Sequence, residues 1–148
     1  MNYCPSCGSS IALLVPADDT RLRHVCSQCK EVHYRNPRNV VGTIPIWENQ
    51  VLLCRRAIEP RHGYWTLPAG FLEIGESTEH GAIRETMEEA GADVEIQSLF
   101  SLLNVAHVEQ VHLFYLAPNG INAGGGWGLY SLRCGFNPTA LPPEYQRL

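Results

Sequence analysis

The chain has 148 residues, of which 45% are hydrophobic and 18% are charged, with a net charge of -4. This composition fits one folded domain, alone or with a small accessory module, and excludes a disordered chain. The negative charge argues against a nucleic-acid partner held by bulk electrostatics, and no apolar run approaches the roughly 18 residues of a membrane helix. The N-terminal MNYCPSCG lacks the basic and apolar regions of a signal peptide, so we expect a cytoplasmic protein without a membrane partner.

Four cysteines open the chain as two C-x2-C pairs that are separated by 18 residues: Cys4, Cys7, Cys26 and Cys29. This spacing is typical of a tetrahedral zinc site, whereas two disulfides or redox pairs are the competing interpretation. No secretion signal is present, and a thioredoxin-like site would need only one pair, so structural Zn²⁺ is favoured. We therefore predict a zinc ribbon over residues 1–35. Its four thiolates leave no open position for chemistry.

A boundary follows at Asn36-Pro37, because a residue before proline is pushed toward extended geometry. The β-branched stretch at 39–47 predicts a strand, and the run at 51–56 predicts the returning strand of a hairpin. The next segment, 64–76, is punctuated by proline and glycine, and predicts a shaped loop with at most one short strand.

A helix is predicted from a cap at Ser77 or Thr78 to about Ala90, with Gly91 just past its end. Two further strands are expected over 94–103 and 111–117.

Six of the fifteen acidic residues lie between Glu73 and Glu89. On a helical wheel, three apolar residues share the face expected to meet a core, and three glutamates lie opposite them. The apolar residues are Ile83, Met87 and Ala90, and the glutamates are Glu85, Glu88 and Glu89. The glutamates can form a solvated acidic face, or they can bind a hard cation such as Mg²⁺ or Mn²⁺, which would relieve their mutual repulsion.

The spacing G-x5-E-x7-R-E-x2-E-E-x-G decides between these alternatives. It is formed by Gly70, Glu76, Arg84-Glu85, Glu88-Glu89 and Gly91, and it resembles the Nudix box at every fixed position. Thr86 and Ala92 are mild departures at positions that usually hold bulky apolar residues. Together with the cysteine pairs and the stretches NPRNVVGTIPIW, VLLCRR and HGYWTLPAGFLEIGE, the chain resembles zinc-ribbon Nudix hydrolases over residues 3–117. These include ADP-ribose and FAD pyrophosphatases.

The resemblance implies an α/β Nudix fold over residues 36–117, with a mixed sheet and a flanking helix behind the ribbon. It also implies Mg²⁺ or Mn²⁺ as catalytic cofactor, with Glu88 and Glu89 as the principal ligands and the carbonyl of Gly70 as another. Glu85 would be a further ligand or a contact of the catalytic base. Arg84 would orient a neighbouring glutamate, plausibly Glu85, by a bidentate contact. Glu76 would support the start of the helix and could join the metal shell.

The implied reaction is hydrolysis of the pyrophosphate bond in a nucleoside diphosphate derivative, with ADP-ribose or FAD expected as substrate and AMP as product. The S-Q-P-W-P-F-P-x-S signature of NADH pyrophosphatases is absent, which makes NADH a less favoured alternative substrate. Trp65 and Phe71 could stack on a base or pack the loop. Arg55 and Arg56 alternate along a strand, so at most one of them should face a phosphate; Arg55 is the candidate.

The last segment, residues 118–148, holds six of the thirteen glycines and shows neither strand alternation nor a helical stripe. We interpret it as an atypical tail, replaced, truncated or frameshifted, that would leave a sheet edge open to homodimer formation. A nucleotide sensor without catalytic activity is the alternative function. A nucleic-acid-binding ribbon is disfavoured, because residues 1–35 carry four basic against three acidic residues and only two aromatic ones.

Overall fold

The computed structural model describes residues 1–47, 50–57, 59, 61–118 and 122–123. Within these ranges, no helix is both long and apolar enough to cross a membrane. The chain forms two compact units, Met1–Pro37 and Arg38–Leu148. The expected limits of ribbon, core and tail stay a prediction, because nearly all of the tail lies outside the described residues.

The N-terminal unit is a small antiparallel sheet whose turns carry the cysteine pairs. Its strands, in sheet order, are β1 (Ile11–Leu14), β2 (Arg23–Cys26) and β3 (Val32–His33). Gly8 follows the first pair with a φ of 73° and donates its backbone N–H to the oxygen of Cys4 at 2.8 Å. This left-handed backbone forms the tight turn predicted there. Only three hydrophobic residues of this unit are buried, Cys4, Val25 and Cys26, so its own core is too small to stabilise it well.

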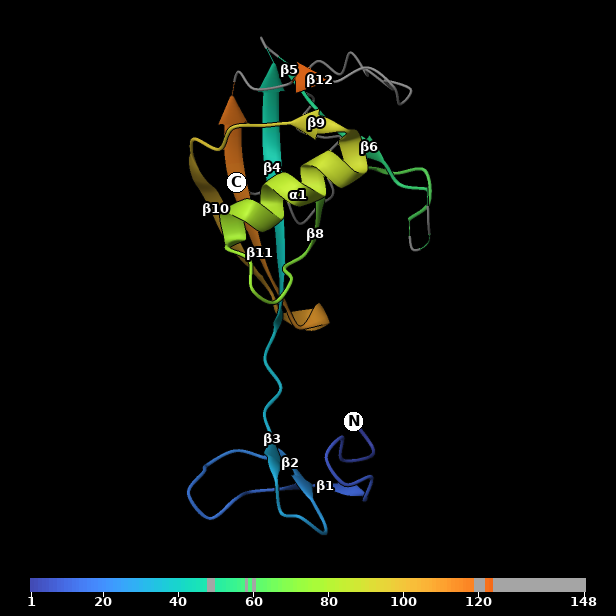
Figure 1. Cartoon of the computed structure of the whole chain (residues 1–148), viewed down its shortest axis with the longest axis vertical. Coiled ribbons are helices and arrows are strands. Elements are labelled where there is room, and N and C mark those ends of the chain that lie inside the picture. The colour runs from blue at the N-terminus through green and yellow to red at the C-terminus, as the bar shows by residue number, and fades with distance from the viewer. Residues whose placement is uncertain (48–49, 58, 60, 119–121, 124–148) are drawn as a thin grey trace. The chain divides into compact units, whose positions relative to one another are not determined.

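The second unit is built on a mixed sheet with the order β10-β11-β4-β5 (Figure 1). Its two central strands run parallel, with Val41 opposite Leu113, and the other pairings are antiparallel. A further strand, β8, pairs with β4 on the side that also holds β5. The strands are β4 (Arg38–Trp47), β5 (Gln50–Val51), β8 (Ala69–Phe71), β10 (Ser98–Val105) and β11 (Gln110–Pro118). The predicted mixed sheet is confirmed.

The predicted continuous strand over 51–56 is wrong. β5 ends at Val51, and the chain resumes as β6 (Cys54–Arg55), which pairs with β7 (Trp65–Thr66). The break follows from Pro45 in β4. Leu52 donates its backbone N–H to the Pro45 oxygen at 2.9 Å, but proline has no N–H to return the bond, so the ladder stops there.

Helix α1 (Thr78–Ala90) crosses one face of the sheet over β4 and β11 (Figure 1). Ser77 caps it by accepting a hydrogen bond from the His80 backbone N–H at 3.2 Å. Gly91 ends it with a left-handed φ of 60°. Both predicted ends of the helix are confirmed.

The predicted buried face of the helix is confirmed for Ile83 and Ala90 and is wrong for Met87. The residues buried against the sheet are Gly81, Ala82 and Thr86, whereas Met87 is 45% exposed. Ile83 and Ala90 are partly buried and pack against a hydrophobic cluster formed by Ala92, Val94 and Ala117. Small side chains set this orientation: a Cβ on Gly81 would lie 3.0 Å from a methyl group of Val41, so the helix approaches β4 more closely than larger residues would allow.

The segment after the helix only partly follows the prediction for 94–103. A two-residue strand, β9 (Ala92–Asp93), comes first, and β10 begins later, at Ser98. Val94 is buried but is not hydrogen-bonded in a β-strand, so its apolar character reflects core packing, and the sequence analysis took it for a strand residue. The strand predicted over 111–117 lies within β11. A short helix, η1 (Ala106–Val108), joins β10 to β11, and β12 (Asn122–Ala123) pairs with β9.

Thr86 is expected to contribute a buried hydroxyl pair to stability. Its Oγ1 donates to the Ala82 oxygen at 2.7 Å and lies 2.6 Å from Thr43 Oγ1, with both side chains fully buried. In Thr86→Val, the Thr43 hydroxyl loses its acceptor, so we expect a loss of about 1–3 kcal/mol in the free energy of unfolding. Urea titration should show that Thr43→Val combined with Thr86→Val costs less than the sum of the single changes. Additive losses would contradict the pairing.

Candidate active site

The backbone of β8 lies directly against the glutamate face of α1. A Cβ built on Gly70 would be 2.3 Å from the carboxyl group of Glu85, closer than any real Cβ contact. Only glycine therefore lets the Glu85 carboxylate occupy this place. Close approach was expected at Gly70, and the group that approaches it is the side chain of Glu85.

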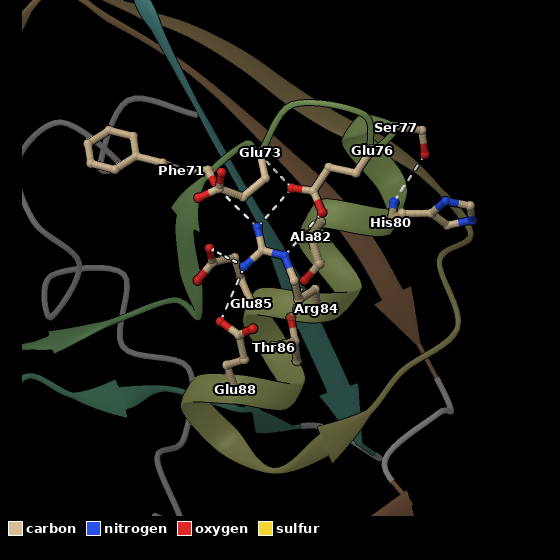
Figure 2. A network of polar contacts seen from close by, with 10 residues as sticks. All are labelled: Phe71, Glu73, Glu76, Ser77, His80, Ala82, Arg84, Glu85, Thr86 and Glu88. Atoms are coloured by element: carbon tan, nitrogen blue, oxygen red, sulfur yellow. Dashed lines mark hydrogen bonds and ion pairs between the residues drawn. The ribbon is translucent and has the colours of Figure 1, made fainter.

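Arg84 forms ion pairs with three glutamates, of which Glu76 lies in the loop before the helix and Glu85 and Glu88 lie on the helix (Figure 2). Its Nε and Nη2 donate to the two oxygens of Glu76 at 3.0 and 2.8 Å. Its Nη1 donates to Glu85 at 2.7 Å and to Glu88 at 3.2 Å, and its Nη2 also donates to the Phe71 oxygen at 3.1 Å.

The prediction of a bidentate contact between Arg84 and Glu85 is therefore wrong, because the bidentate partner is Glu76. Adjacent helix positions point about 100° apart, so Glu85 reaches one guanidinium nitrogen only. Glu76 comes from the preceding loop and can meet the flat edge of the guanidinium with both oxygens.

Glu76 is the carboxylate most strongly held by this network. Hydrogen bonds from Arg84, and a further one from the Glu73 backbone N–H at 2.7 Å, lower the pKa of Glu76 to about 2. The same pairing raises the pKa of Arg84. Both groups therefore stay charged over the physiological range, and Glu76 joins the loop to the helix as the predicted support.

Glu89 is held by a different contact. Its Oε2 accepts a hydrogen bond from the Ala69 backbone N–H at 3.0 Å. The residue as a whole is exposed, but its carboxyl group is partly withdrawn from water, and this raises its pKa. The charges of Glu85 and Glu88 add to the rise, while the Ala69 bond and Arg56 oppose it. A carboxylate in such surroundings would be stabilised by a cation.

The oxygen donors around Gly70 fit a hard divalent ion such as Mg²⁺ or Mn²⁺ by their chemistry, since they are carboxylate and carbonyl groups. They are not drawn together as a preformed site. Among the described residues, groups of three or more ligand side chains with donor atoms within 4.8 Å of one another occur only in the N-terminal unit. Glu88 is turned toward Arg84 and Glu89 toward Ala69, so binding an ion would require these two side chains to reorient.

The three candidate substrate-binding residues fall into two separate contacts. Arg55 and Trp65 are paired across β6 and β7, and the Arg55 guanidinium carbon lies 5.8 Å from the centre of the Trp65 ring. Phe71 instead has the Arg38 guanidinium over its ring at 4.9 Å. Arg55 and Trp65 could act together, whereas Phe71 belongs with Arg38.

Arg56 is a residue that the sequence analysis did not select. Its charge lowers the pKa of Glu89, so it acts electrostatically on one of the candidate metal ligands. Arg55 donates from Nε to the Gly63 oxygen at 3.1 Å. Strand alternation had indicated that at most one of these arginines faces a phosphate, and the sequence analysis selected Arg55.

The four cysteines of the N-terminal unit form one cluster, as predicted. Their sulfur atoms lie within 4.8 Å of one another, with Cys7 Sγ 3.4 Å from Cys26 Sγ and 3.7 Å from Cys29 Sγ. A tetrahedron with Zn–S distances of about 2.3 Å has edges of about 3.8 Å. All four thiols are free, so the cluster fits Zn²⁺ and the disulfide alternative is not supported.

Known families match both units. Residues 2–35 match a zinc-ribbon family described as "Nudix N-terminal", and residues 36–144 match the NUDIX domain family. A crystal structure of a NUDIX hydrolase from Nitrosomonas europaea is 48% identical, with a TM-score of 0.76, over 80% of this chain and 67% of that one.

The names of two curated relatives point to different substrates. "NAD-capped RNA hydrolase NudC" of Vibrio atlanticus is 34% identical over 64% of this chain, which spans 33% of that protein's length. "Putative ADP-ribose pyrophosphatase YjhB" of Bacillus subtilis is 32% identical over 76% of this chain and 56% of its own. The glutamate-bearing helix, the mixed sheet and the cysteine cluster agree with these matches, and the chain belongs to the NUDIX domain family, with a Nudix-type zinc ribbon at its N-terminus.

Proposed function

We propose that this chain hydrolyses the pyrophosphate bond of a nucleoside diphosphate linked to a second moiety, with Mg²⁺ or Mn²⁺ as cofactor. The observation that carries the proposal is the convergence of Glu85 and Glu89 on the backbone of β8, where Gly70 leaves room for a carboxylate. Two carboxylates therefore lie against β8, and Glu88, which now contacts Arg84, follows on the same helix.

The roles of the residues follow from the chemistry of the bond. A pyrophosphate is a poor electrophile because its oxygens are negative, and a bound divalent ion would neutralise this charge and help activate water. Glu85, Glu88, Glu89 and the Gly70 carbonyl would hold the ion. Arg84 and Glu76 would position Glu85 and Glu88, since both oxygens of Glu76 are already engaged by Arg84. Arg56 would face the substrate phosphates from beside Glu89.

ADP-ribose or FAD is the proposed substrate, with AMP as one product. The name of the Bacillus subtilis relative supports an ADP-ribose-type compound. The names of the NudC relatives favour an NAD-type pyrophosphate, so NADH is the second candidate. We propose no nucleic-acid substrate. Because the NudC relatives are named as hydrolases of NAD-capped RNA, such an RNA is included in the test.

Product analysis tests this function directly. The full chain would be incubated with ADP-ribose, FAD, NADH and NAD-capped RNA, each with Mg²⁺, with Mn²⁺ or with excess chelator. We expect AMP from ADP-ribose or FAD only when the divalent ion is present. Faster cleavage of NADH or capped RNA would make that compound the assigned substrate. Nucleotide binding without turnover would contradict the proposed hydrolase and indicate a nucleotide sensor.

Three further expectations belong to this proposal. The protein would be cytoplasmic, it would be able to form a homodimer, and its core would end near residue 117. Native mass spectrometry of the protein from its source would give both the subunit number and the natural C-terminus. A longer acidic C-terminus would show that the tail over residues 118–148 is aberrant.

Gly70→Ala is expected to impair activity while the fold persists. The added methyl group would meet the Glu85 carboxylate at 2.3 Å, and a flexible side-chain end can move away at little cost. The displaced carboxylate would leave its place against Gly70, so we expect a fall in kcat of about 10–100-fold. Circular dichroism should show an intact fold. Full activity in Gly70→Ala would remove Glu85 from the proposed ligand set.

A further inference from the structure

A second group of metal-ligating side chains lies beside the four-cysteine cluster. The sulfur of Cys4, the carboxylate of Glu31 and the imidazole of His33 each offer a donor atom, and these atoms lie within 4.8 Å of one another. Glu31 and His33 are two residues apart at β3, so their side chains point to the same face of this extended segment.

His33 gives this group an unused donor. Its side chain is only 10% exposed, and its Nε2 is buried with no hydrogen-bond partner among the described residues. The same nitrogen lies 4.0 Å from Glu31 Oε2. Buried polar atoms are almost always paired, so an orphaned imidazole nitrogen beside a carboxylate indicates a missing partner between them.

The charges of the group indicate that the partner is a cation. Glu31 Oε2 lies 3.8 Å from Cys4 Sγ, and Ser6 Oγ donates to the same oxygen at 2.5 Å. When Cys4 serves as a zinc ligand it is a thiolate. A Zn²⁺ ion with four thiolates keeps a net negative charge, so a carboxylate this close to Cys4 is repelled unless further positive charge lies near it.

We propose that the ribbon binds a second divalent metal ion on Cys4, Glu31 and His33, next to the four-cysteine ion, with the Cys4 thiolate shared between them. One sulfur, one imidazole nitrogen and one carboxylate oxygen are a ligand set that suits Zn²⁺. Three protein ligands leave a fourth position for water. The second ion therefore binds more weakly than the first, which has four thiolates.

Zinc counting on the full chain tests the proposal. The protein would be equilibrated with micromolar Zn²⁺ in excess Mg²⁺, which keeps zinc off the helix glutamates, and its zinc content would be measured by mass spectrometry. We expect two ions per chain in the wild type and one in His33→Asn. His24→Asn is the matched control, because His24 lies opposite His33 in β2 and belongs to neither ligand group. It should keep two ions.

The absorption of the Co²⁺-substituted protein reports the first ion, because four thiolates give an intense charge-transfer band. His33→Asn should keep this band. One ion in the wild type, or two in His33→Asn, would overturn the second site. If His33→Asn loses both ions, the zinc content of Glu31→Gln is measured instead, and this variant should lose only the second ion. Loss of both ions there too would mean that these side chains serve the four-cysteine ion alone.

Discussion

Glu89→Gln is expected to lower metal-dependent pyrophosphate hydrolysis by about 100–1000-fold, because it removes a charged ligand from the proposed ion site. The amide oxygen of glutamine can still accept the hydrogen bond from Ala69, so the local backbone should be retained. The loss should appear in kcat, measured as AMP release at saturating Mg²⁺ or Mn²⁺. Added metal should not restore the rate.

The stability of Glu89→Gln separates this effect from unfolding. Partial burial raises the pKa of Glu89 in the folded chain, so its ionised form disfavours folding at neutral pH. Removing the charge should leave the free energy of unfolding at pH 7 equal to or above that of the wild type. This difference should disappear as the pH falls through the raised pKa, where Glu89 is protonated in the wild type.

Glu79→Gln is the matched control, since Glu79 is an exposed acid on the first turn of the same helix. It should keep the rate of the wild type. Equal losses in Glu79→Gln and Glu89→Gln would indicate a general effect of helix charge and would contradict the assignment of Glu89. A fully active Glu89→Gln would contradict the proposed metal site itself.

The parts of the molecule that local chemistry determines were predictable from the sequence. Ser77 and Gly91 mark the ends of α1 because a side-chain cap and a left-handed glycine act within one turn. The cysteine cluster was predictable for the same reason, since two C-x2-C pairs on short turns have few other ways to meet.

What depends on tertiary packing was not predictable. The wheel selected Met87 for the core by hydrophobicity, but the small residues Gly81 and Ala82 allow close approach to β4, and they turn Met87 outward. The predicted second strand of the hairpin ends early, opposite Pro45. The missing N–H of Pro45 has this effect only because the second strand pairs with β4 at that position, which the sequence alone does not show.

The site shows the same division. The motif places Gly70, Glu85 and Glu89 in the right elements, and the structure brings Glu85 to Gly70 and Glu89 to Ala69. The partner of Arg84 depends on the path of the loop before the helix, which carries Glu76. Spacing along the chain says little about such a path, so the sequence analysis assigned the bidentate contact to Glu85.

Arg84→Met is the second change for which we expect a large effect. It removes one guanidinium from three carboxylates and from the Phe71 oxygen, while the length of the side chain is kept. Glu85 and Glu88 would lose their orientation, and changes in residues that orient metal ligands cost about 10–100-fold in metal affinity or activity. We expect the Mg²⁺ concentration for half-maximal rate to rise by this factor. An unchanged metal dependence would show that Arg84 has no positioning role.

The pH dependence of stability tests the same contact independently of catalysis. The pKa of Glu76 is lowered to about 2 from its ordinary value of 4.5, so its pairing with Arg84 stabilises the fold fully above about pH 4.5. This contribution should be lost as the pH falls from 4.5 toward 2. In Arg84→Met the Glu76 carboxyl group keeps only the hydrogen bond from the Glu73 backbone N–H, so its pKa is lowered less than in the wild type. The stability difference between the two proteins should therefore be constant above pH 5 and shrink below it. Urea titrations at several pH values measure this difference, and the zinc ribbon, common to both proteins, cancels in the comparison. A difference that stays constant down to pH 3 would mean that Arg84 stabilises the fold through other acceptors than Glu76.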